Sequence, residues 1–121
     1  MGDAYNWISN KGSLEEGLKA YKKAEELDPN NIIYINFVGD MLIRMGKYDE
    51  AILQFQKTLR ITNESGYANL SIAKAYKQLK IYDSAREHYQ KAIEVFSKNN
   101  KDGQFDKEIL EARKEMAQLP K

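Results

Sequence analysis

The feature that most constrains this chain is an internal repeat of 34 residues. Residues 48–57, with the sequence YDEAILQFQK, recur without a gap as residues 82–91, YDSAREHYQK, and residues 14–23 form a third, weaker copy. The copies share small residues and an aromatic residue at fixed spacing, namely Gly17/Ala51/Ala85, Tyr21/Phe55/Tyr89 and Ala24/Thr58/Ala92. A fixed period of about 20–50 residues indicates stacked supersecondary units, each of which buries its apolar face only against its neighbours.

The spacing inside each unit predicts paired helices. Small residues seven positions apart, with an aromatic residue four positions after the first, lie on one face of a helix. A second periodic run precedes each copy, and in the middle unit it is formed by Ile35, Val38, Gly39 and Leu42. We therefore expect an all-α chain of about seven helices, near residues 3–11, 13–27, 31–45, 48–61, 66–79, 82–97 and 103–118.

The boundaries of these helices follow from turn chemistry. Gly12 and Gly46 occupy matching positions and are predicted to stop the first helix of their units, while Lys80 takes this place in the third unit. The last predicted helix breaks the repeat, and its apolar residues Phe105, Ile109, Ala112 and Met116 form a single stripe. One apolar side and one charged side are what the end cap of a repeat array requires.

The unit resembles the tetratricopeptide repeat. In that family a W-x2-L-G-x2-Y run is followed by an A-x3-F run, in which a small residue precedes an aromatic residue by four positions. The middle unit supplies Ile35-x2-Val38-Gly39-x2-Leu42 and then Ala51-x3-Phe55. The resemblance implies an α-solenoid of antiparallel helix pairs wound into a right-handed superhelix. We expect one structural domain, with repeats at 1–31 (shortened first helix), 32–65 and 66–99 and a capping helix in 100–121.

The resemblance also implies that the first helix of each unit lines a concave groove that binds a peptide or a segment of another protein. At about 100° per residue, the face opposite the core positions can be read from the sequence. The expected groove residues are Asn6, Ile33, Asn36, Phe37, Asp40, Ile43, Arg44, Tyr67, Leu70, Ser71, Lys74, Lys77 and Gln78. Ile33, Phe37, Tyr67 and Leu70 are expected to form an exposed apolar patch, although they could instead pack on a neighbouring helix or on the C-terminal helix.

One subtype of the family is not expected. Chaperone-binding members hold a C-terminal carboxylate with Lys and Asn in unit one, Asn in unit two, and Lys and Arg in unit three. The matching positions here are Gly2, Asn6, Phe37, Tyr67 and Ser71, of which only Asn6 agrees. A clamp for an anion needs cations, so a chaperone C-terminal tail is not the expected partner.

Composition argues against several other functions. The 19 basic and 18 acidic residues leave a net charge of +1, which is unlike a nucleic-acid binder that neutralises phosphates. There is no cysteine, and His88 is the single histidine, so no catalytic residues, metal site or cofactor are expected and the chain is not expected to be an enzyme. No apolar run is long enough to span a membrane, and the first residues do not resemble a signal peptide, which favours a cytoplasmic protein.

Two expectations concern the N-terminal unit. Tyr5 stands where the family prefers glycine, and Gly17 is expected to make room for its ring. Trp7 could leave an apolar end surface, so the alternative function is a structural or self-assembling segment of a longer array that forms homo-oligomers end to end.

Overall fold

A computed structural model of the chain describes residues 10–121, with side-chain detail from residue 12 onward. In this part of the chain there are six α-helices, one short 3-10 helix and no strand. They are α2 (Asn10–Leu27), α3 (Ile32–Arg44), α4 (Tyr48–Ile61), α5 (Gly66–Gln78), α6 (Tyr82–Lys98), η1 (Lys101–Gly103) and α7 (Asp106–Ala117). The all-α prediction is confirmed, and α3 to α6 each begin and end within one residue of the expected positions.

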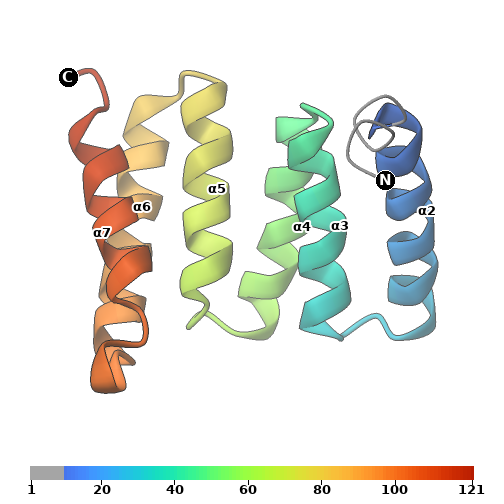
Figure 1. The fold of residues 1–121 in the computed structure, drawn as a ribbon, viewed down its shortest axis with the longest axis horizontal. Coiled ribbons are helices and arrows are strands. Elements are labelled where there is room, and N and C mark those ends of the chain that lie inside the picture. The colour runs from blue at the N-terminus through green and yellow to red at the C-terminus, as the bar shows by residue number, and fades with distance from the viewer. Residues whose placement is uncertain (1–9) are drawn as a thin grey trace, which may run out of the picture.

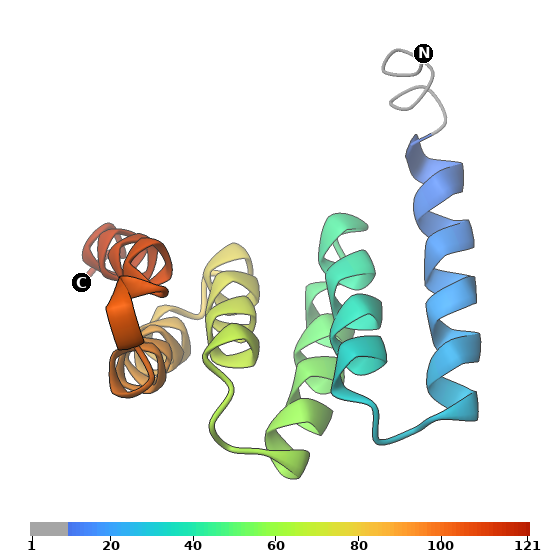
Figure 2. The ribbon, with the colours of Figure 1, turned by 60° about the horizontal axis from the view of Figure 1, so that its bottom comes forward.

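Consecutive helices run antiparallel and pack on one another in series, as in an α-solenoid. In Figure 1, α3, α5 and α7 lie nearer the viewer, while α4 and α6 lie behind them. The turned view in Figure 2 shows the same two layers. We call the face formed by α3, α5 and α7 the inner face.

The repeated small and aromatic residues form the core between the layers. Phe55 and Tyr89 are fully buried, as are Ala51 and Ala85, the small residues that precede them by four positions. The small residues let the helices approach closely, and each aromatic ring fills the space beside them. The ring of Phe55 also lies close to Gly39, where an added Cβ would be 2.6 Å from ring carbons.

The turns within the second and third units share one geometry. Gly46 and Lys80 both have positive φ, +78° and +64° respectively. In each case the next residue donates its N–H to a carbonyl five positions back, Lys47 to Leu42 at 2.8 Å and Ile81 to Tyr76 at 2.9 Å. This is the Schellman motif, which ends a helix with one residue in the left-handed conformation.

The first unit departs from the expectation. Gly12 does not stop a helix, because α2 begins at Asn10 and continues through it, without positive φ at that glycine. The expected break before residue 13 is therefore wrong. An added Cβ at Gly17 would meet Sδ of Met41 at 3.2 Å. Tyr5, the expected neighbour of Gly17, and Trp7 lie outside the described residues.

The C-terminal helix covers the end of the array. Ala112 is fully buried against the α5–α6 core, and Phe105, Ile109 and Met116 pack on it, so the predicted stripe is confirmed. Leu119, beyond the end of α7, is also buried there. A 3-10 turn at η1 precedes α7, which begins at Asp106 rather than near residue 103.

Candidate functional site

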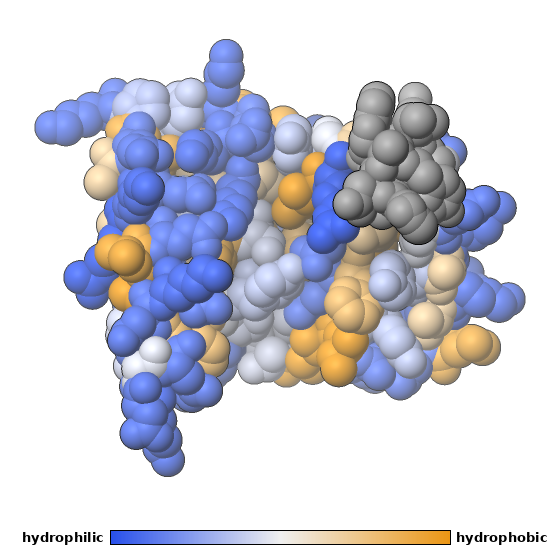
Figure 3. All heavy atoms as spheres, in the orientation of Figure 1, coloured by the Kyte–Doolittle hydropathy of each residue, from blue (hydrophilic) through white to orange (hydrophobic). Residues whose placement is uncertain are grey.

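The inner face carries exposed apolar surface over α3 and the start of α5. Ile33 is 60% exposed, Phe37 39% and Tyr67 43%, and we call these three residues the apolar patch. Figure 3 shows the apolar surface over the lower half of α3. The rings of Phe37 and Tyr21 have centroids 4.7 Å apart, so α2 holds Phe37 in place while leaving much of it open.

A hydrogen bond joins α3 to α5 beside the patch. The hydroxyl of Tyr67 donates to Oδ1 of Asp40. Burial raises the pKa of the Asp40 carboxyl above 3.8, although the Tyr67 hydroxyl and nearby Arg44 act in the opposite direction. The pKa of Tyr67 is raised by burial and by Asp40, so its hydroxyl keeps its proton and remains a donor. The bridge fixes Tyr67 on the inner face.

Ion pairs join α5 to α7 over the other half of the inner face. Nζ of Lys74 lies 2.5 Å from Oε2 of Glu111, and Nζ of Lys77 lies 3.5 Å from Oε1 of Glu115. The buried Tyr89 hydroxyl also donates to Oε1 of Glu115, at 2.7 Å. Burial, followed by Glu115, raises the pKa of Tyr89. The pairs and this hydrogen bond attach α7 to the array.

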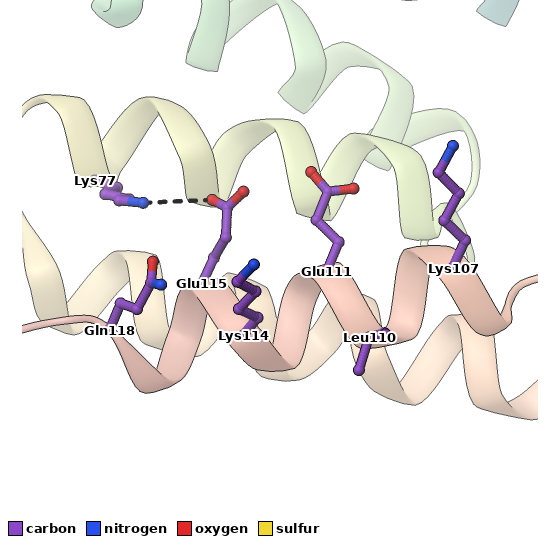
Figure 4. Close-up of a pocket in the computed structure, with 7 residues that line it drawn as sticks. All are labelled: Lys77, Lys107, Leu110, Glu111, Lys114, Glu115 and Gln118. Atoms are coloured by element: carbon purple, nitrogen blue, oxygen red, sulfur yellow. Dashed lines mark ion pairs between the residues drawn. The ribbon is translucent and has the colours of Figure 1, made fainter.

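Two open cavities follow this charged half. The first lies between α3 and α5 and is lined by four predicted groove residues, Ile43, Lys74, Lys77 and Gln78. Tyr48 and Glu115, which were not predicted, complete its lining. The second, shown in Figure 4, lies along α7 and is lined by Lys77, Lys107, Leu110, Glu111, Lys114, Glu115 and Gln118. The inner face therefore has an apolar half over α3 and a charged half over α5 and α7 (Figure 3).

Two predicted groove residues are not available to a partner. Leu70 is 6% exposed and belongs to the core between α5, α6 and α7. Ser71 is 7% exposed. Both expectations are corrected, because α5 is covered by helices on more sides than the repeat phase alone indicates. For Leu70, packing against the end of the array is the correct alternative.

Other predicted residues are engaged or lie outside the described part. Oδ1 of Asn36 accepts a hydrogen bond from the buried Thr58 hydroxyl at 2.7 Å. Thr58 stands where the other two repeats have alanine, and this hydrogen bond gives its buried hydroxyl a partner. Arg44 and Gln78 are exposed at the C-terminal ends of α3 and α5. Asn6 lies outside the described residues.

The residues that sequence reasoning missed are those of α7. Lys107, Glu111, Lys114 and Glu115 line the inner face, although the repeat phase could not place them, because the helix leaves the 34-residue register. Their signal was the dense charge of the last helix. Nδ1 of His88 donates to the Ser84 carbonyl, 2.9 Å away, and the His88 ring lies tilted against that of Tyr76 with centroids 5.5 Å apart. Within residues 10–121 no group of three acidic or histidine side chains is placed to hold a metal ion, and none of the helices there could cross a bilayer.

Comparison with known sequences finds the repeat independently. The sequence model of the Tetratricopeptide repeat family matches residues 30–98, and a second model of the same description matches residues 9–31. The chain is 33% identical over 105 residues to the Hsp70-Hsp90 organizing protein of Triticum aestivum, a match that covers 75% of this chain. The chain spans only 18% of the length of that relative.

Solved structures share the fold. The Yersinia enterocolitica type III secretion translocator chaperone SycD superposes with a TM-score of 0.82 over 96% of this chain and 79% of that one, at 15% identity. The TPR2B domain of yeast Sti1, solved as a complex with pHsp70, superposes with a TM-score of 0.79 over 92% of this chain and 88% of that one, at 22% identity.

Proposed function

This chain belongs to the tetratricopeptide repeat family, and we propose that it is a protein–protein interaction module that binds a segment of another protein on its inner face. The observation that carries the proposal is the apolar patch of Ile33, Phe37 and Tyr67, which is held open beside hydrogen-bonding groups. Exposed apolar surface rimmed by polar residues marks partner sites in soluble proteins. The Sti1 domain, which has the same fold, was solved with such a partner, pHsp70.

The partner that we propose is not a chaperone C-terminal tail. Phe37 stands at the position of the clamp's unit-two Asn, and Tyr67 and Ser71 stand at the positions of its unit-three Lys and Arg. The two unit-three cations that would hold a terminal carboxylate are therefore replaced by a tyrosine and a buried serine. Phe37 and Tyr67 instead offer ring surface and one hydroxyl that is already donated to Asp40.

We also propose that the module is non-enzymatic and cytoplasmic, with 1–31, 32–65 and 66–99 as repeats and 100–121 as the end cap. Several polar groups of the inner face are paired across helices, namely Lys74 with Glu111, Lys77 with Glu115, and Tyr67 with Asp40. This pairing stabilises the array.

Peptide binding tests the proposal. We expect Phe37→Ser to weaken binding of a partner peptide at least tenfold, because a partly buried aromatic anchor is lost from the centre of the site. Leu53→Ser is the matched control, since Leu53 is 64% exposed on α4 and lines no part of the inner face. Equal affinity of the Phe37 variant and the parent, with a peptide that binds the parent, would refute the assignment.

The second candidate is a structural segment that assembles end to end. At the described C-terminal end Ile109, Met116 and Leu119 are turned into the core, whereas Leu110 of α7 is 68% exposed. Sedimentation over a concentration series measures the association directly. A dimer that is lost on Trp7→Ser would support this candidate, and a monomer at all concentrations would contradict it.

A further inference from the structure

The charged half of the inner face is not balanced. Its carboxylates already have partners: Asp40 accepts from Tyr67, Glu111 pairs with Lys74, and Glu115 pairs with Lys77 and accepts from Tyr89. In the part of the chain that the structure describes, three exposed cations of this face have no carboxylate within 4.0 Å; they are Arg44, Lys107 and Lys114. What the face lacks is negative charge.

Two of these cations, Lys107 and Lys114, belong to α7 and line the cavity along that helix. Figure 4 shows Lys107, Glu111 and Glu115 projecting from α7 on the side of α5, with Leu110 on the other side. Lys114 lines the same cavity. The other carboxylates of α7 do not line it: Asp106 accepts from Asn100 at 2.8 Å, and Glu108 has one oxygen buried. An anion approaching this cavity therefore meets lysines that have no competing partner.

From this arrangement we propose that the inner face binds an extended internal segment that carries a large apolar residue and, about six positions away, at least two acidic residues. The apolar residue would contact Ile33, Phe37 and Tyr67, and the acidic residues would meet Lys107 and Lys114 of α7. The inference rests on the proposed function and names the chemistry of the partner at that same site.

The separation of the two features follows from helix and strand dimensions. The inner-face helices α3, α5 and α7 pack mainly on α4 and α6 rather than on one another. A helix with its side chains is about 10–12 Å across, so the two steps from α3 to α5 and from α5 to α7 span at least about 20 Å. An extended chain rises about 3.3 Å per residue, and about six residues cover this distance. Because the cations lie along helix α7 rather than at the clamp positions, the segment needs no free C-terminus.

A displayed library of random 12-residue peptides, with blocked C-termini, tests the inference. The library is selected on the chain and counter-selected on the Phe37→Ser variant, so that only peptides that use the apolar patch are kept. We expect the surviving peptides to be enriched in acidic residues about five to seven positions from a large apolar residue. The most enriched peptide is then synthesised, and its affinity is measured by fluorescence anisotropy.

Two double variants with the same change of charge separate the site from a general charge effect. Lys107→Gln with Lys114→Gln removes the proposed contacts, whereas Lys23→Gln with Lys91→Gln removes exposed lysines of α2 and α6. Since exposed ion pairs are weak, we expect each removed contact to lower affinity about two- to fivefold. The control is expected to change affinity less than twofold, and circular dichroism shows whether each variant is folded.

The outcomes are distinct. Selected peptides without acidic enrichment, or equal affinity losses in the two double variants, would overturn this inference and leave the binding function in place. Failure to recover any peptide that distinguishes the chain from its Phe37→Ser variant would overturn the proposed function and the inference together. Acidic enrichment with a loss confined to the Lys107 and Lys114 variant would support both.

Discussion

Replacement of Gly39 by alanine probes the packing on which the repeat depends. Gly39 lies on α3 against the ring of Phe55 from α4, and an alanine Cβ would lie 2.6 Å from two ring carbons. Carbon atoms in contact prefer about 3.5–4.0 Å, so the ring would have to move by about 1 Å. Phe55 is fully buried, and its ring lies edge-on to that of Tyr67 with centroids 6.0 Å apart, which leaves it little room.

The magnitude follows from two opposing effects. Overpacking of a well-filled core costs about 1–3 kcal/mol, and alanine is favoured over glycine inside a helix by about 1 kcal/mol. We therefore expect Gly39→Ala to lower the free energy of unfolding by up to about 2 kcal/mol. In the Phe55→Ala background the ring is absent, so the helix preference alone remains and the same substitution should stabilise by about 1 kcal/mol.

Urea denaturation followed by circular dichroism measures this double-mutant cycle. Phe55→Ala by itself should cost about 3–5 kcal/mol, and Phe55→Leu provides a milder background. Gly12→Ala is the matched control, because Gly12 is helical with no atom within 4 Å of an added Cβ and should stabilise both backgrounds alike. If Gly39→Ala had the same sign with and without the ring, the contact would not limit the packing of α3 on α4.

Three further predictions concern single residues. Lys80→Gly should raise the free energy of unfolding by about 1 kcal/mol, because Lys80 is held at a positive φ that glycine adopts freely. Gly46→Ala at the matching turn should lower the free energy of unfolding by a similar amount, and thermal melts show whether the melting temperature rises for the first variant and falls for the second. Because burial raises the pKa of Asp40, this residue's contribution to the free energy of unfolding is fully present below pH 3.8 and is lost as the pH rises through the folded-state pKa. The stability of Asp40→Asn relative to the parent should therefore increase between about pH 3 and pH 7. A constant difference in stability across that range would contradict the burial of the carboxyl. Tyr89→Phe should destabilise by about 1.5–3 kcal/mol in urea titrations, because it removes a buried donor to the charged Glu115, and an unchanged midpoint would mean that this hydrogen bond does not hold α7.

The helices themselves could be predicted almost entirely from the sequence. The spacing of Ala51 and Phe55, repeated at Ala85 and Tyr89, sets the helix face, and turn residues set the ends of α3 to α6. Local rules failed at Gly12, where the chain continues as a helix. A glycine stops a helix only where the chain takes a left-handed conformation, as it does at Gly46, and the residue type does not reveal which conformation is chosen.

The groove was predicted less completely. Repeat phase correctly put Ile33, Phe37 and Tyr67 at the surface, but it also put Leu70 there, which is buried. The reason is that solvent exposure on α5 depends on α7, whose position is not given by the period. The partners of Lys74 and Lys77 are unpredictable for the same reason, since both pair with carboxylates of α7.

The sequence by itself determined the periodic part of this protein, because a repeated pattern of small and aromatic side chains can bury its apolar faces only by stacking one helix pair on the next. Only the tertiary structure decided where the array ends and what its surface offers. The packing of α7 against α5 and α6 buries Leu70 and pairs two lysines of α5 with carboxylates of α7. The two ion pairs join residues 37 and 38 positions apart across a break in the repeat, so no local pattern encodes them.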